Sequence, residues 1–232
     1  MGGSEQWQLQ LPDLQQVRQV FAVDLPGFGK NAKAEAPASI DGFASFVLDH
    51  MTAQGVPTFD LLGHSMGGMI VQEMVALAPE RVDSLVLYGT AATGNLPGRF
   101  ESFARSRERA LADGVTRTAR RISATWFLEL EAAGEFENCA RLAEGSSMRA
   151  ILAALDAMET WERRANLPNI SCPTQIIWGE QDRTYKWEQV ELLWNEISAA
   201  SLAVLPHCSH AAHMENPRLF NQILMEFLDR NN

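Results

Sequence analysis

The chain has 232 residues, 46% of them hydrophobic, and a formal net charge of −10 at neutral pH. This length allows one sizeable core, and α/β chains of this size often form a single domain. The acidic balance excludes nucleic acid and anionic membrane surfaces as expected partners, because both bind clustered Lys and Arg. No apolar run is long enough to span a membrane, and the start of the chain lacks a signal-peptide pattern. We expect a cytoplasmic protein.

Five short apolar runs, each ended by Gly, Pro or Asp, have the length and β-branched content of buried strands. They are Val20–Leu25, Phe59–Leu62, Val82–Tyr88, Thr174–Trp178 and Ser201–Leu205. Helical patterns lie between them, at Phe43–Gln54, Met69–Ala78, Trp187–Ile197 and Pro217–Leu228. The alternation predicts an α/β fold with a mainly parallel sheet and helices on both faces.

One stretch, residues 96–161, carries helical patterns and no convincing strand. We interpret it as a helical cap inserted into a core made of residues 1–95 and 162–232. Its many arginines are typical of a solvated helix face rather than a binding cluster.

Gly63-His64-Ser65-Met66-Gly67 follows an apolar run and opens a helical pattern, as a G-x-S-x-G nucleophile turn requires. Ser65 would sit on a strained turn at the edge of the sheet, and bulky neighbours in place of Gly63 and Gly67 would clash there. The N–H of Met66, at a helix start, would stabilise an oxyanion. The alternative is an ordinary glycine-rich turn.

A serine nucleophile needs a base and an acid that orients the base. In chain order the acid comes second and follows a late strand. Asp182, in Trp178-Gly179-Glu180-Gln181-Asp182, fits this position, with Glu180 and Asp156 as weaker alternatives. No C-x-x-C pair occurs among the cysteines Cys139, Cys172 and Cys208, so we expect no metal and no cofactor.

Together with the Ser65 motif, Asp24-Leu25-Pro26-Gly27-Phe28-Gly29 makes nearly the whole chain resemble the α/β-hydrolase family. The resemblance decides among three neighbouring histidines, because His210 is followed by Glu215 and Pro217 as the family's catalytic histidine is. His207 and His213 are then loop or pocket residues, and a metal site built from the three is a weak alternative.

The resemblance also implies that a second oxyanion donor lies near Met1 or Gly2. In the family, several strands precede this loop, so the N-terminal strands are missing here and we expect a fragment of a longer enzyme. The absent strand would lie between those ending at Asp24 and Gly63, leaving unpaired backbone on both sides. The alternatives are domain swapping and direct pairing of the two neighbours.

The closest resemblance is to enol-lactonase-like hydrolases, carboxylesterases and C–C bond hydrolases with caps. It implies a serine hydrolase that cleaves an ester, lactone or related carbonyl compound through an acyl-enzyme. A C–C bond hydrolase or lyase acting on a dienoic acid, and a non-catalytic ligand-binding protein or inactive fragment, remain as alternatives. We expect a small-molecule substrate, with His64, Trp126 and Trp161 lining its pocket, and leave a homo-oligomer open.

Overall fold

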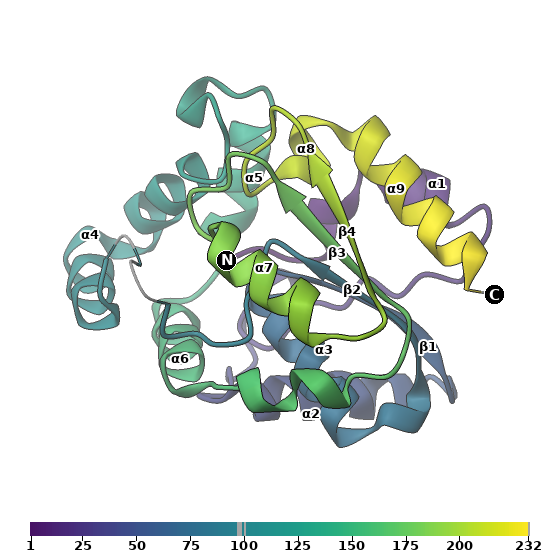
Figure 1. Cartoon of the computed structure of the whole chain (residues 1–232). Coiled ribbons are helices and arrows are strands. Elements are labelled where there is room, and N and C mark those ends of the chain that lie inside the picture. Colours follow the sequence, from purple (N-terminus) through teal and green to yellow (C-terminus); the bar gives the residue numbers. More distant parts are fainter. Residues whose placement is uncertain (97–98, 100, 232) are drawn as a thin grey trace.

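The computed structural model describes residues 1–96, 99 and 101–231. Its centre is a parallel sheet of four strands in the order β1-β2-β3-β4, shown in Figure 1. The strands are β1 Phe59–His64, β2 Val82–Tyr88, β3 Thr174–Gly179 and β4 Ala200–Leu205. Four of the five predicted strands are therefore confirmed.

The helices alternate with these strands, as predicted, except in the long insertion between β2 and β3. They are α1 Leu11–Leu14, α2 Ile40–Ala53, α3 Met66–Leu77, α4 Phe103–Ala124, α5 Phe136–Glu144, α6 Met148–Thr160, α7 Trp187–Glu196, α8 Ala212–Glu215 and α9 Pro217–Arg230. In the part of the chain that the structure describes, no helix is both long and apolar enough to cross a membrane.

Helices cover both faces of the sheet because alternate strand residues point to opposite sides. In β2, Leu85 and Leu87 belong to a large apolar core that also contains side chains of α2, α3 and α7. Val86 and Tyr88 belong to a second core, which α9 closes on the other face. The sheet is thus buried on both sides, as its nearly continuous apolar strands require.

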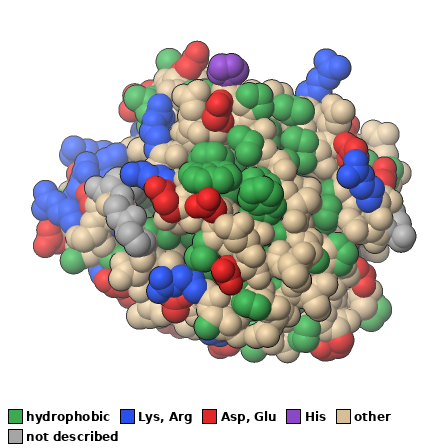
Figure 2. Space-filling model, viewed as in Figure 1, with side chains coloured by type: hydrophobic (Ala, Val, Ile, Leu, Met, Phe, Trp, Pro, Cys, Tyr) green, Lys and Arg blue, Asp and Glu red, His purple; other side chains and the backbone are tan. Residues whose placement is uncertain are grey.

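Helices α4 and α6 lie at one side of the molecule, away from α9, and α5 packs against α4 (Figure 1). Figure 2 shows Lys and Arg side chains concentrated on that side. The arginines there pair with neighbouring acids, as Arg107 does with Asp156 and Arg120 with Glu137. Such exposed pairs are typical of a solvated surface, which agrees with the interpretation of the arginine-rich stretch.

The two ends of this helical region lie side by side. Thr93 forms an antiparallel bridge with Glu162, the N–H of Gly94 donates to the Trp161 carbonyl, and that of Arg163 donates to the Ala92 carbonyl. The chain thus leaves and re-enters the core at one place. The cap boundaries at 96 and 161 stay a prediction, and residues 97, 98 and 100 lie outside the described residues.

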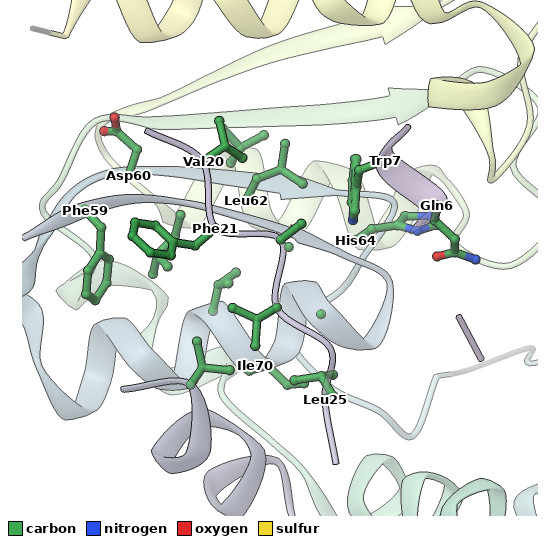
Figure 3. Close-up of a pocket in the computed structure, with 18 of the residues that line it drawn as sticks. Gln6, Trp7, Val20, Phe21, Leu25, Phe59, Asp60, Leu62, His64 and Ile70 are labelled. Carbon is green, nitrogen blue, oxygen red and sulfur yellow. The ribbon is translucent and has the colours of Figure 1, made fainter. Parts of the chain in front are cut away.

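The predicted strand Val20–Leu25 is wrong, because no strand forms there. Among the described residues, no other backbone group is hydrogen-bonded to the backbone of residues 19–23. A largely apolar cavity of about 570 Å³ separates this segment from β1. In Figure 3, Val20 and Phe21 line it from one side, and Phe59 and Leu62 from β1. Without a neighbouring strand within reach, the segment has no ladder to join.

Candidate active site

Ser65 occupies a strained turn between β1 and α3. Its backbone has φ 57° and ψ −121°, a conformation that residues with a side chain rarely adopt. The strand before it and the helix after it impose this geometry, and the Ser65 N–H donates to the Tyr88 carbonyl at 3.0 Å. Strain of this kind persists only where the surroundings enforce it, and it concentrates at functional sites.

The glycines around Ser65 do different things. A Cβ at Gly63 would lie 2.2 Å from the Gly67 carbonyl oxygen, so the predicted steric need holds at this position. A Cβ at Gly67 would meet no atom within 4 Å beyond its chain neighbours and the backbone of its own helix, so the predicted clash there is wrong. A Cβ at Gly68 would lie 2.5 Å from Thr90, so this glycine lets α3 pack closely against the end of β2.

The predicted acid and base are directly hydrogen-bonded. Asp182 follows β3 and its Oδ2 lies 2.9 Å from Nδ1 of His210. The other oxygen, Oδ1, accepts the N–H groups of Thr184 at 2.7 Å and Tyr185 at 3.1 Å. The weaker candidates have other partners. Glu180 accepts the N–H of His207, and Asp156, in α6, forms an ion pair with Arg107 of α4.

A residue that the sequence analysis missed packs against this pair. The Tyr185 ring stacks on that of His210 at 5.6 Å between centroids, and the Tyr185 N–H donates to Asp182. Among the described residues, Nε2 of His210 has no hydrogen-bond partner. Bonds between a catalytic histidine and its nucleophile are often long before substrate binds.

A second missed contact fastens the His210 loop. Glu215 accepts the Ser209 N–H at 2.5 Å and the Leu128 N–H at 2.6 Å. Arg183 donates to the carbonyls of Phe127 and Leu128. The loop that carries His210 is thereby tied to the segment following α4. The family pattern pointed to Glu215, but not to its partners in the helical region.

Comparison with known proteins agrees with this geometry. A family profile described as the alpha/beta hydrolase fold matches residues 1–217. The chain belongs to the α/β hydrolase family. The 3-oxoadipate enol-lactonase 2 of Acinetobacter baylyi is 26% identical, with 97% of this chain and 84% of its own length aligned.

Two further α/β hydrolases are similar. A 2-hydroxy-6-oxononadienedioate/2-hydroxy-6-oxononatrienedioate hydrolase of a Pseudomonas species is 27% identical, aligned over 91% of this chain and 77% of its own. The crystal structure of the enol-lactonase from Burkholderia xenovorans LB400 superposes with a TM-score of 0.90 at 22% identity, covering 98% of this chain and 87% of that one. The last likeness shows the fold, and the named activities support a hydrolase.

In this α/β hydrolase, all but one of the predicted oxyanion and pocket residues line a single cavity. Met1, Gly2, His64, Met66 and Trp126 line the same cavity as Ser65. The Trp126 ring also lies 5.5 Å from that of His210, edge to face. Their functional roles stay predictions.

The exception is Trp161, which does not line this cavity. Its indole N–H donates to Oε2 of buried Glu73 at 3.0 Å, and Arg163 pairs with the same carboxylate. The role of Trp161 in a substrate pocket stays a prediction. A buried indole needs an acceptor, and this buried carboxylate, whose charge Arg163 balances, supplies one.

The other two histidines of the site support the His210 loop. His64 Nε2 lies 3.0 Å from the His210 carbonyl oxygen, and the Tyr88 hydroxyl donates to that same carbonyl. His213 Nδ1 lies 3.0 Å from the Tyr88 hydroxyl. Burial and the neighbouring histidines hold the pKa of His64 well below its ordinary value. Burial, with His210, lowers the pKa of His213 to about 3. Both rings are therefore neutral at neutral pH.

Proposed function

We propose that this α/β hydrolase is a serine hydrolase that cleaves an ester, lactone or related carbonyl compound through an acyl-enzyme. The observations that carry the proposal are the buried hydrogen bond between Asp182 and His210 and the strained turn that holds Ser65. A carboxylate at Nδ1 fixes the imidazole tautomer that leaves Nε2 free to accept a proton. The hydrolase names of the relatives support the same reaction class.

In the proposed reaction, Ser65 Oγ attacks the carbonyl carbon and its proton passes to His210 Nε2. Asp182 stabilises the resulting imidazolium without taking the proton. The Met66 N–H stabilises the oxyanion, with a second donor near Met1 or Gly2. The leaving group departs with the proton from His210, and water, deprotonated by the same ring, releases the acid and regenerates Ser65.

The test combines a substrate assay with a covalent probe. Ser65→Ala should abolish hydrolysis of short-chain p-nitrophenyl esters, and a fluorophosphonate should label the wild-type protein at Ser65. Unchanged turnover in Ser65→Ala would overturn the proposal. The matched control is Ser102→Ala, which removes a hydroxyl that only caps α4 and should leave both readouts unchanged.

A C–C bond hydrolase acting on a dienoic acid is the second candidate, and the 27% identical Pseudomonas relative favours it. Some enzymes of that kind use the serine and histidine for proton transfer. Rapid quenching followed by mass spectrometry of the Ser65 peptide separates the two. A trapped acyl adduct supports the acyl-enzyme route, and turnover of a dienoic acid without an adduct supports the alternative.

A further inference from the structure

Tyr88, the last residue of β2, is hydrogen-bonded to both the turn that carries the nucleophile and the loop that carries the base. Its backbone carbonyl accepts the Ser65 N–H at 3.0 Å. Its side-chain hydroxyl donates to the His210 carbonyl at 2.8 Å. One residue of a central strand thus contacts the two segments whose side chains must meet in the proposed reaction. The proposed mechanism uses Ser65 and His210 and assigns Tyr88 nothing.

Tyr88 is itself firmly held by the sheet and the core. β2 lies between β1 and β3, and Tyr88 pairs with His64 on one side and with Ile177 on the other. Its side chain is fully buried, and its ring packs against those of His64 and Phe220, at 4.3 Å and 4.9 Å between centroids. Close packing restricts the rotamer of a buried side chain. The Tyr88 hydroxyl therefore has a fixed place relative to the strands.

The remaining partners of this hydroxyl identify it as the donor to His210. The hydroxyl oxygen accepts the backbone N–H of His213 at 3.1 Å, and Nδ1 of the same histidine lies 3.0 Å away. Burial holds the pKa of the Tyr88 phenol well above its ordinary value, so the hydroxyl keeps its proton. With neutral His213 donating from its backbone and from Nδ1, the hydroxyl proton is directed to the His210 carbonyl.

The His210 carbonyl is held by side chains. Tyr88 donates to it, and His64 Nε2 lies 3.0 Å from it. Among the residues that the structure describes, no backbone N–H bonds to this oxygen. Asp182 holds the other end of the residue, at Nδ1 of the ring. These two anchors together fix the direction of Nε2, whereas a His210 held only at Nδ1 could pivot about its bond to Asp182.

We propose that Tyr88 is a positioning residue, whose hydroxyl holds the main-chain carbonyl of His210 so that Nε2 faces Ser65 Oγ. This rests on the proposed function, in which those two atoms exchange a proton. Tyr88 neither contacts the substrate nor transfers a proton. Because its own carbonyl holds the Ser65 N–H, both reacting side chains are placed relative to the same residue. A misplacement of about 1 Å at reacting groups can cost about 100-fold in rate, so such a remote bond affects catalysis.

The variant that isolates the hydroxyl is Tyr88→Phe, which keeps the ring and the backbone carbonyl. We expect kcat for a p-nitrophenyl ester, and the rate of fluorophosphonate labelling at Ser65, to fall by about 10- to 100-fold while KM changes little. The melting temperature should also fall, because two His213 donors lose their acceptor. The control is Ile177→Val, which loosens the same core without removing a polar contact. It should lower the melting temperature and leave kcat at the wild-type value.

A second readout reports on the carbonyl itself. His210-Ala211 is the only His-Ala pair in the sequence, so carbon-13 at histidine carbonyls and nitrogen-15 in alanine give one correlated NMR signal, from this peptide bond. A carbonyl carbon moves upfield when it loses a hydrogen bond. Tyr88→Phe should move this signal upfield, and Ile177→Val should leave it in place. His64→Leu removes the other donor to this carbonyl, so it should move the signal in the same direction and lower kcat, even if Tyr88→Phe fails to fold.

The outcomes separate the two proposals. If wild type labels at Ser65 and Tyr88→Phe labels equally fast, the positioning role is wrong and the serine hydrolase stands. If wild type neither labels nor hydrolyses esters, the serine hydrolase is wrong and the role of Tyr88 falls with it. An unmoved carbonyl signal, or equal losses of kcat in Tyr88→Phe and Ile177→Val, would also overturn the positioning role. A moved signal with a loss of kcat absent from Ile177→Val supports it.

Discussion

Asp182 Oδ2 and His210 Nδ1 lie 2.9 Å apart, and both side chains are completely shielded from solvent. Asp182→Asn should keep the shape of this pair and reverse its hydrogen-bonding preference, because an amide N–H stabilises the tautomer with its proton on Nε2. That tautomer cannot accept the Ser65 proton. We expect kcat to fall by about 10⁴-fold with little change in melting temperature, measured with a p-nitrophenyl ester.

The control for this prediction is Asp156→Asn, which changes a half-exposed carboxylate that pairs with Arg107 on the surface. Its kcat should equal that of wild type. Equal losses in both variants would mean that Asp182 has no special part in the reaction.

Glu215 joins the His210 loop to the segment after α4 through two backbone N–H groups. In Glu215→Gln, the amide oxygen accepts one of the two backbone N–H groups. The amide N–H₂ group then faces the other N–H, which is left without an acceptor. We expect a loss of stability of about 1–3 kcal/mol and a lower kcat, because the base is less firmly held. Urea denaturation and the ester assay measure the two effects. Glu226→Gln, on the exposed side of α9, is the control and should alter neither.

Gly67 and Gly68 are adjacent in α3 but meet different surroundings. Gly68→Ala would bring its Cβ to 2.5 Å from Thr90, so α3 or Thr90 must move. We expect a loss of about 1–3 kcal/mol, the ordinary cost of overpacking. Gly67→Ala has open space around its Cβ and gains helix propensity, so its melting temperature should hold or rise. Equal effects of the two changes on thermal denaturation would contradict the close contact of α3 with the sheet.

Buried His213 should make stability depend on pH. Its pKa is about 3 in the folded chain, against 6.5 for an ordinary histidine. Between these values the unfolded chain takes up a proton that the folded chain does not, so the free energy of unfolding falls as pH falls below 6.5. At pH 5 the loss from this residue is about 2 kcal/mol.

His213→Asn should remove that part of the pH dependence, because the Asn amide cannot titrate and its N–H₂ group can donate to the Tyr88 hydroxyl in place of Nδ1. Urea denaturation of both proteins at pH 7 and pH 5 gives the comparison. The same loss of stability between the two pH values in both proteins would show that His213 is not the group responsible.

The sequence predicted those features that depend on neighbours along the chain. Strand, turn and helix around Ser65 follow one another directly, so the motif and its apolar flanks sufficed. The pairing of Asp182 with His210 spans 28 residues. Asp182 was predicted because it follows a late strand, and His210 because Glu215 and Pro217 follow it as they follow the catalytic histidine of the α/β-hydrolase family. The hydrophobic periodicity of residues 96–161 was sufficient to predict helices there.

Features set by contacts between distant segments were not predictable in this way. Val20–Leu25 has the composition of a strand, but a strand also needs a partner, and the cavity beside it leaves none within reach. Trp161 was predicted to line the pocket as an aromatic residue of the helical region. Its indole N–H donates to Glu73, which lies 88 residues earlier in the chain. Nothing in the sequence around Tyr185 indicates that its ring stacks on His210, because that contact exists only once the segments after β3 and β4 lie side by side.

The cavity beside β1 has a consequence for the strand that carries the nucleophile. Among the residues that the structure describes, β1 pairs with a strand on one side only, with β2, through Asp60–His64 and Ser84–Tyr88. In a parallel strand, alternate amides face alternate sides. Amide hydrogen exchange along β1 should therefore be uneven, slow at the positions that face β2 and faster at those that face the cavity. The turn that positions Ser65 therefore depends on the β1–β2 pairing for its rigidity, and local opening of that pairing would also loosen the turn.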